Sequence, residues 1–329
     1  MRYLFVRTFM AILLVNICHA QDGKFNIVEF YPIENAHSYI GFSIKYMGYA
    51  MVRGRFETYR GTFRYDPDNV SKTSVSVSVD VNSIDTDHDW RDKDLKSENW
   101  FDVENFPKMH FVSTKAVSTA SGFDLIGNLT IKDITKEIVF KMNPASGILK
   151  DIRGDFQVIL TGEISIDRTD FGVEGKRWSA IKEGITGVAN EVRVEISILG
   201  KQMNLDNLKN WVSDEKNPIG QIYKIISDQN LENGLKAFEG MKANPDIRLN
   251  VRTLDLVGQV LLKEERIAEA ISIFKRNLET FPEESLVYDS YAHALAISGN
   301  LTDAKTFYQK ALEKNPDNQN ASEILRYLD

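Results

Sequence analysis

The sequence predicts two folded parts of different class, an antiparallel β-barrel followed by an all-α region of helical repeats. From Ser74 to Val81 small polar residues alternate with valines, which is the period-two pattern of a strand with one buried face. Two longer segments, Phe156–Ile166 and Val192–Ile198, show the same alternation. Further along, the apolar period becomes helical and a motif recurs after 34 residues, which is typical of stacked helix pairs.

Residues 1–20 form a separate N-terminal segment. Arg2 and Arg7 precede the apolar run Phe9–Val15, and Cys18–Ala20 has the small-residue form of a cleavage site. A transmembrane helix needs about 20 apolar residues, and this run is shorter. The segment is therefore predicted to be a signal peptide that is cleaved after its last residue, and the protein is expected to be periplasmic or secreted.

Charge and cysteine content limit the possible functions. The chain of 329 residues has 47 acidic and 40 basic side chains, for a net charge of -7. Nucleic-acid binding depends on a cationic surface, so no nucleic-acid partner is expected. The one cysteine, Cys18, lies in the predicted signal peptide, so the mature chain is expected to have no disulfide.

The barrel part is predicted to extend over residues 21–202, where many short alternating strands are separated by turns. Eight strands would close around an interior that is filled by side chains or holds one small ligand. Gly127 and Gly162 fall on the inward faces of their strands, where a solid barrel would carry bulky residues. We expect them to provide pore space, although relief of strand curvature is an equally simple explanation.

Several short motifs in this part carry a family resemblance. They are Ser83–Thr86, Arg91-Asp92 with Leu95–Ser97, Trp100–Asp102, Phe106-Pro107 before Phe111–Thr114, Gly127–Lys132 and Asp167–Gly172. Together they resemble the YceI-like family of secreted lipid-binding proteins. Their common order between Gly23 and Gly200 is far more specific than any one motif. One position departs from the family, which usually carries histidine where this chain has Asp94.

The resemblance implies a lipocalin-like barrel of eight strands whose apolar pore takes a long isoprenoid chain. Such a chain gains about 0.8 kcal/mol for each CH₂ group transferred from water, so it can bind without specific polar contacts. The inward-facing residues then become a predicted pore lining, which consists of Phe42, Ile44, Phe56, Val77, Val79, Phe101, Phe111, Leu129, Ile131, Phe140, Phe156, Val158, Ile164 and Phe171.

Patterns that indicate catalysis are not found in the sequence. The histidines outside the signal peptide (His37, His88, His110 and His293) have no metal-ligand spacing, and neither a nucleophile elbow nor a phosphate-binding loop appears. We therefore predict no enzyme, no metal and no cofactor other than a bound isoprenoid lipid. Arg91 and Arg168 lie beside aromatic residues, where each could form a salt bridge at the barrel mouth or contact a lipid head group.

The polar segment 203–218 is predicted to be a linker, and residues 219–329 are predicted to form tetratricopeptide-like repeats. The positions Leu254, Val257, Gly258, Leu261, Ala270, Phe274 and Pro282 recur as Tyr288, Tyr291, Ala292, Leu295, Ala304, Tyr308 and Pro316. A third, degenerate unit begins near Ile219. Such stacks present a concave groove, for which we predict the lining residues Asn250, Arg252, Asp289 and His293 as contacts to a protein partner.

The combined prediction is a secreted or periplasmic binding protein that holds an isoprenoid or a similar amphiphile in its barrel. Its repeats would bind a protein partner, and the mature chain would have no transmembrane segment. Two alternatives remain open at this point. One is a scaffold whose barrel has a filled core and that acts only through its repeats, and the other is an enzyme that acts at the barrel mouth.

Overall fold

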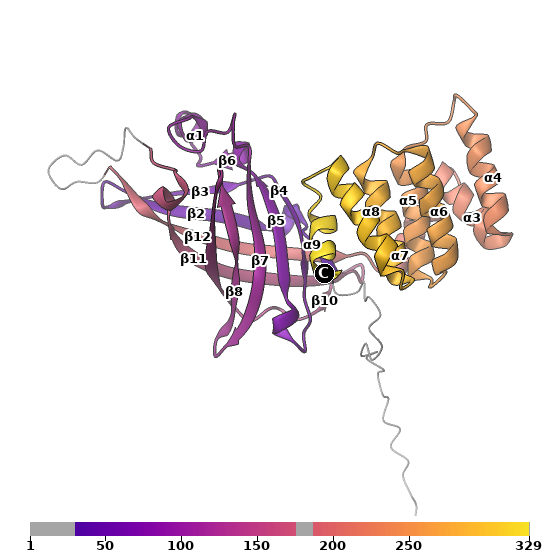
Figure 1. Cartoon of the computed structure of the whole chain (residues 1–329), viewed down its shortest axis with the longest axis horizontal. Helices are drawn as coiled ribbons and strands as arrows, with labels where there is room; N and C mark the ends of the chain where they lie inside the picture. The colour runs from indigo at the N-terminus through magenta and orange to yellow at the C-terminus, as the bar shows by residue number, and fades with distance from the viewer. Residues whose placement is uncertain (1–29, 176–186, 329) are drawn as a thin grey trace, which may run out of the picture.

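The computed structural model describes residues 30–175 and 187–328, which form a curled antiparallel sheet and a separate arc of helices (Figure 1). The strands are β1 (Phe30–Pro32), β2 (Tyr39–Tyr46), β3 (Ala50–Phe56), β4 (Tyr59–Arg64), β5 (Ser74–Asp80), β6 (Ile84–Asp85), β7 (Lys108–Thr119), β8 (Gly122–Ile131), β9 (Ile134–Met142), β10 (Leu149–Lys150), β11 (Phe156–Asp167) and β12 (Val188–Gln202). Four short 3-10 helices, η2 (Asn35–His37), η3 (Val70–Lys72), η4 (Val81–Ser83) and η5 (Arg168–Phe171), join some of them.

All strands in the described part of the chain belong to one sheet, in the order β1-β4-β5-β7-β8-β9-β11-β12-β2-β3-β6, with β10 paired to β11. The prediction of eight strands is therefore wrong, because short strands extend the sheet beyond its long ones. The two ends of this order, β1 and β6, are not hydrogen-bonded to each other, so the sheet curls without a continuous closing ladder. A single bridge between Ile33 and Gly200 links the segment after β1 to β12.

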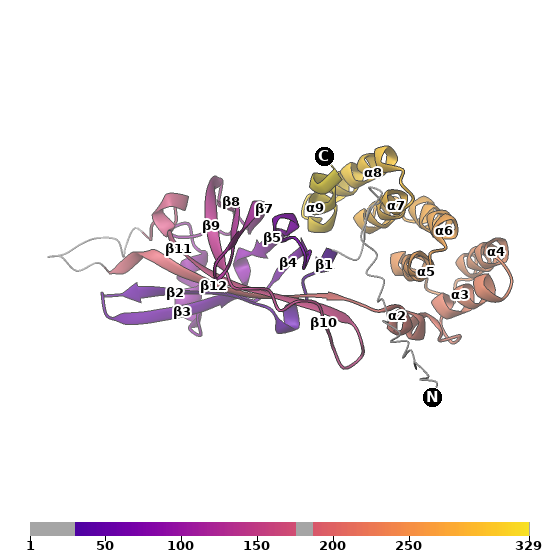
Figure 2. The ribbon, with the colours of Figure 1, turned by 90° about the horizontal axis from the view of Figure 1, so that it is seen from below.

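The helices are α1 (Asp89–Lys96), α2 (Leu205–Val212), α3 (Pro218–Asp228), α4 (Leu231–Lys242), α5 (Val251–Lys263), α6 (Ile267–Thr280), α7 (Ser285–Ile297), α8 (Leu301–Lys314) and α9 (Gln319–Leu328). From α3 to α8 they pack as antiparallel pairs that form an arc, which α9 extends (Figure 2). Gly258 allows this close packing, because a β-carbon there would lie 2.6 Å from the Phe274 ring of α6. The 34-residue repeat thus corresponds to the pairs α5–α6 and α7–α8.

The predicted linker, 203–218, contains the ordered helix α2. Asn204 caps this helix, and Leu208 and Val212 are buried against Val260 of α5. On the barrel side, Asp155 accepts hydrogen bonds from the Asn204 backbone N–H (2.9 Å) and the Asn207 amide (2.6 Å). The segment connects the two parts, but it holds them together instead of separating them.

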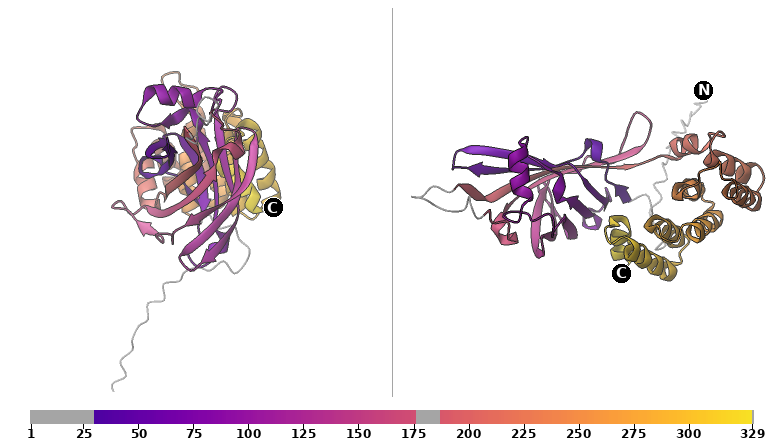
Figure 3. Two further views of the ribbon diagram at one scale, coloured as in Figure 1. Left: turned by 90° about the vertical axis from the view of Figure 1, so that its left-hand side faces the viewer. Right: turned by 90° about the horizontal axis from the view of Figure 1, so that it is seen from above.

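The last helix, α9, packs on the outer face of β4 and β5, so the helical arc meets the barrel at both ends (Figure 3). The Ser76 hydroxyl donates to the Gln319 side chain over 2.6 Å, and both residues are buried. The sequence predicts one buried face for β5. The structure shows both faces buried, because α9 covers the serines while the valines face the barrel interior.

The predicted signal peptide lies outside the described residues. Among the helices that the structure describes, none is long and apolar enough to cross a bilayer.

Candidate functional site: an apolar cavity in the barrel

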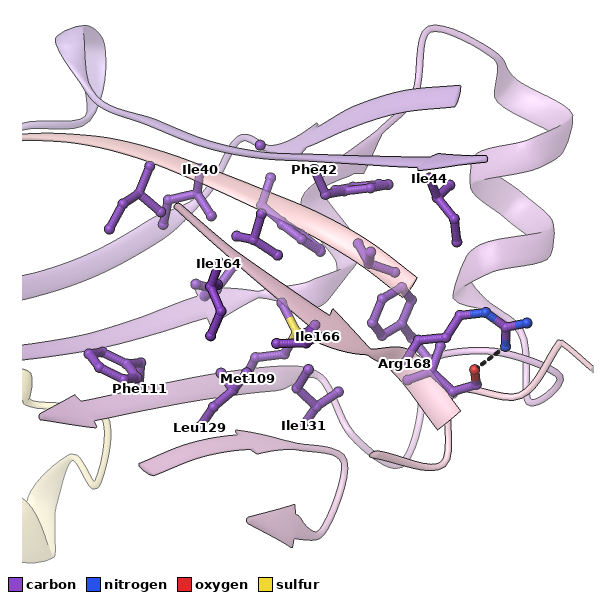
Figure 4. A pocket seen from close by; sticks show the side chains of 18 of the residues that line it. Ile40, Phe42, Ile44, Met109, Phe111, Leu129, Ile131, Ile164, Ile166 and Arg168 are labelled. Carbon is purple, nitrogen blue, oxygen red and sulfur yellow. Dashed lines mark hydrogen bonds between the residues drawn. The ribbon is translucent and has the colours of Figure 1, made fainter. Parts of the chain in front are cut away.

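The curled sheet encloses a cavity of about 440 Å³ whose walls are almost entirely aliphatic and aromatic (Figure 4). Ligand pockets in proteins typically occupy about 300–1,000 Å³, so this space is large enough for a ligand. The cavity exists because alternate residues of each strand point inward. Ile164 of β11 and Val194 of β12, for example, are paired in register and both face the cavity.

Most residues predicted as pore lining are placed in the cavity wall. They are Phe42, Ile44, Phe56, Val77, Val79, Phe101, Phe111, Leu129, Ile131, Phe140 and Ile164. The other three residues lie elsewhere. Phe156 stands under the Lys150 ammonium, 5.3 Å from the ring centroid, while Val158 and Phe171 are packed in the barrel core outside the cavity wall.

The prediction missed a set of wall residues on β2, β5, β11 and β12. They include Ile40, Val75, Ile166, Val192, Val194, Ile196 and Ile198. The same period-two alternation that identified the other wall residues runs through each of these strands. The signal was therefore present in the sequence, and choosing the whole inward face of each strand would have found them.

One end of the cavity is closed by aromatic residues. Phe63 of β4 lines the cavity and stacks on Tyr31 of β1, with ring centroids 5.6 Å apart. Gly200 of β12 makes room for this pair, since a β-carbon there would lie 2.4 Å from the Phe63 ring. These residues form the floor of the cavity, at the end of the barrel that faces the helical arc.

The polar residues of the cavity wall lie mainly at the opposite end, around α1 and η5, which we call the mouth. Trp100 is buried there between two charged groups. Its indole N–H donates to Asp94 over 2.9 Å, and the Arg168 guanidinium lies over its ring, 5.1 Å from the centroid. Asp94 therefore orients an aromatic residue of the mouth.

Arg168 is a buried cation whose five N–H donors are all used by the protein. Its Nε donates to the Ala189 carbonyl, its Nη1 to the Val173 and Glu174 carbonyls, and its Nη2 to Val188 O and the Asn190 side chain. No carboxylate of the described residues forms a salt bridge with it, and burial lowers the pKa of its guanidinium. Of the two predicted roles, a head-group donor is disfavoured, because a fully bonded guanidinium has no free N–H. Arg168 instead ties η5 to the start of β12.

Arg91 of α1 has a similar local role. Its Nε donates to the Thr86 hydroxyl (2.8 Å) and its Nη2 to the Thr86 carbonyl (2.7 Å), while Asp92 accepts from the Thr86 backbone N–H over 2.9 Å. These bonds fix α1 against the segment that follows β6. The mouth is therefore built from charged residues that position aromatic ones.

The histidines do not form a metal site in the described part of the chain, where no group of three potential ligands comes together. His88 and His110 both touch the cavity. His110 is half-buried on β7, and this burial lowers the pKa of its imidazole. The neutral imidazole costs less free energy to bury in an apolar wall than the charged form does.

Gly127 and Gly162 do not provide pore space, so that prediction is wrong. A β-carbon at Gly127 would lie 2.6 Å from the Ser113 Cα and the Val112 carbonyl oxygen. At Gly162 it would lie 2.5 Å from the Met142 sulfur and 2.8 Å from the Lys141 carbonyl oxygen. Both glycines allow neighbouring strands to approach closely, which agrees with the alternative that they serve the curvature of the sheet.

Two of the four predicted groove residues are not available to a partner. Asp289 is buried and accepts from the Asn320 amide of α9 at 3.0 Å, and burial raises the pKa of its carboxyl to about 6. His293 is bonded to the Tyr308 hydroxyl, and burial lowers its pKa to about 4. Only Asn250 and Arg252 are exposed, at the start of α5, where Asn250 caps the helix.

Residues 31–199 match the YceI-like domain, and the chain belongs to that family. A UPF0312 protein of Pseudomonas aeruginosa is 32% identical over 167 residues, which are 51% of this chain and 83% of that protein. A UPF0312 protein of Yersinia enterocolitica is 33% identical over 140 residues, or 43% of this chain and 72% of that protein.

Solved structures resemble each part of the chain. BcnA of Burkholderia cenocepacia has a TM-score of 0.45 and 20% identity, and the match covers 51% of this chain and 98% of BcnA. A polyisoprenoid-binding domain from Saccharophagus degradans has a TM-score of 0.40 and 13% identity over 53% of this chain and 98% of that domain. The first tetratricopeptide domain of Spaghetti (RPAP3), bound to an HSP90 peptide, has a TM-score of 0.26 and 19% identity over 35% of this chain and 92% of that domain.

Proposed function

We propose that this protein binds the apolar chain of an isoprenoid or a similar long amphiphile inside its barrel and does not act as an enzyme. The observation that carries the proposal is the cavity of about 440 Å³, whose wall is apolar and whose charged residues are gathered at the mouth. An apolar chain gains about 0.8 kcal/mol per CH₂ group that leaves water, so the wall itself supplies the binding free energy. The isoprenoid is chosen because of the family resemblance.

The two alternatives fit the structure less well. In a scaffold with a filled barrel core, side chains would occupy the interior, as they do in barrels without ligands. The cavity of about 440 Å³ does not fit that alternative. An enzyme needs reactive groups that are free to meet a substrate. At the mouth, however, Arg168 donates all its N–H groups to the protein, and Arg91 is bonded to Thr86.

The location and the partner are also part of the proposal. We infer that the leader of residues 1–20 exports the protein, so that it works in the periplasm or outside the cell. The helical arc supplies a surface for a protein partner, in the manner of other tetratricopeptide-like stacks. With Asp289 and His293 engaged inside the arc, this surface would use exposed positions such as Arg252.

Filling the cavity by mutation tests the binding function. Ile164→Trp and Val194→Trp place a large side chain into the empty space from two paired strand positions. The protein should stay folded and lose saturable binding of a fluorescent isoprenoid analogue. Ser165→Trp is the matched control, since Ser165 is exposed on the same strand and does not line the cavity. Unchanged binding in both cavity variants would refute the proposal.

A further inference from the structure

The rim of the cavity mouth carries an exposed group of large apolar side chains, which we call the rim patch: Met47, Tyr49 and Met51 on the β2–β3 hairpin and Trp90 on α1. Tyr49 is 98% exposed and Trp90 is 60% exposed. Isolated exposed apolar residues are common, but several of them around one opening mark an interaction site.

The rim patch is continuous with the cavity wall. Tyr46 and Val52, which flank the hairpin turn, line the cavity, and Trp90 itself is part of the lining. The hairpin is held at the mouth by its turn, because Met47 donates its backbone N–H to Gly187 O just before β12 (2.9 Å). Met47 and Gly48 both have positive φ, at 52° and 76°, which produces the tight turn that presents Tyr49.

We propose that the rim patch docks on the surface of a lipid bilayer, so that the cavity mouth opens toward the membrane from which its ligand comes. This inference rests on the proposed function. A long apolar chain has a very low concentration in water, so a protein that takes one up must meet the lipid phase. Tyrosine and tryptophan are also the residues that gather at membrane–water interfaces.

Two further features fit this partner. Lys45 and Arg53 are exposed on the outer face of the same hairpin, where cations can meet lipid phosphates. Asp87 and Asp89, which precede Trp90, are exposed as well, and their negative charge opposes binding to anionic lipids. The hairpin also points away from the helical arc, which lies at the other end of the molecule (Figures 1 and 2). A bilayer at the mouth would leave the arc free for a protein partner.

The test is co-sedimentation of the mature protein with vesicles of phosphatidylcholine and phosphatidylglycerol. The double variant Tyr49→Ser/Met51→Ser, at two rim positions that do not line the cavity, should bind the vesicles at least about tenfold more weakly, because it removes apolar surface that would enter the interface. Its thermal unfolding should be unchanged, since both side chains are exposed. The control is Ile152→Ser/Trp211→Ser, which removes a fully exposed isoleucine and a 66% exposed tryptophan away from the mouth.

A second measurement separates this inference from the proposed function. A fluorescent isoprenoid analogue delivered in detergent should bind the wild type and the Tyr49→Ser/Met51→Ser variant equally, because neither substituted residue lines the cavity. If the wild type binds the analogue but not the vesicles, membrane docking is wrong and the binding function stands. If the control variant loses vesicle binding as strongly as the rim variant, the attraction is unspecific and the inference also fails. If the analogue does not bind at all, the proposed function itself fails.

Discussion

Phe30 and Tyr31 are neighbours in β1 whose side chains enter two different hydrophobic cores. Tyr31 points into the barrel and stacks on Phe63 at the cavity floor, whereas Phe30 is buried in the helical core that contains Ala321 and Ile324 of α9. Adjacent side chains of a strand point to opposite faces, so one short strand joins both cores. The floor of the cavity is thus one residue away from the helical arc.

Removing the Phe30 ring should uncouple the two parts. A buried phenylalanine changed to alanine typically costs about 3–5 kcal/mol, and here the loss falls on the contact between barrel and arc. We expect Phe30→Ala to lower the free energy of unfolding and to split a single thermal transition into two, as measured by calorimetry. Tyr49→Ala, at a 98% exposed position, is the control and should change stability by less than about 0.5 kcal/mol. A single, unshifted transition for Phe30→Ala would contradict this and show that the Phe30 ring does not couple the barrel to the arc.

The Arg326–Glu323 pair of α9 should be important for stability. Glu323 is buried and accepts from Arg326 at 2.8 Å on both carboxylate oxygens, while Arg326 also donates to the Ser113 carbonyl of the barrel. Arg326→Met leaves a buried carboxylate unpaired, which costs about 3–5 kcal/mol in urea denaturation. Adding Glu323→Gln should recover much of this loss.

The matched control for this pair is Arg193→Met. Arg193 and Glu163 form an ion pair on the barrel surface with both side chains about half exposed, so its loss should cost less than about 1 kcal/mol. Equal effects of Arg326→Met and Arg193→Met would mean that the α9 contact adds nothing beyond an ordinary surface ion pair.

Gly127→Ala should destabilise the barrel. The added methyl group meets the backbone of β7 at 2.6 Å, and backbone cannot move aside as a flexible side chain can. We expect a loss of at least about 1–3 kcal/mol by chemical denaturation. Gly240→Ala on α4 is the control, because its β-carbon meets nothing within 4 Å and alanine favours a helix. If Gly127→Ala is as stable as the wild type, Gly127 would once more be a candidate for pore space.

Asp289 and His293 should make opposite contributions to the pH dependence of stability. Burial raises the pKa of the Asp289 carboxyl to about 6, so between about pH 4 and 6 the folded protein keeps a proton there that the unfolded chain has released. The stability that this carboxyl contributes is therefore complete below about pH 4 and is lost as pH rises to about 6. Burial lowers the pKa of His293 to about 4, so its contribution is present above about pH 6.5 and is lost as pH falls toward 4. The two slopes partly cancel in the wild type.

Single variants reveal each slope. Asp289→Asn leaves only the histidine contribution, so stability should rise with pH between about 4 and 6.5. His293→Gln leaves only the carboxyl contribution, so stability should fall over the same range, by up to about 3 kcal/mol. Both variants keep the other charged and polar side chains that face the pair, which are Asp255, Lys263, Tyr308 and Asn320. Urea denaturation at several pH values measures both effects. Identical pH profiles for the two variants and the wild type would contradict the assigned shifts.

The sequence predicted what depends on local pattern. Alternation along β5 and β11 identified residues such as Val77 and Ile164 that line the cavity, and the 34-residue period located the helix pairs. It could not show that α9 buries Ser76, because that contact joins segments 243 residues apart. In the same way, the roles of Gly127 and Arg168 depend on neighbours across the sheet and on backbone carbonyls, which no alternation reveals.

The central claim, that the barrel holds an apolar chain, is tested most directly by native mass spectrometry of the mature protein purified without added lipid, followed by solvent extraction. We predict one bound long-chain amphiphile per protein, recovered as free lipid in the extract and absent from Ile164→Trp. A protein that is detected only at its ligand-free mass, yields no lipid on extraction and shows no saturable binding of a fluorescent isoprenoid analogue would contradict the claim.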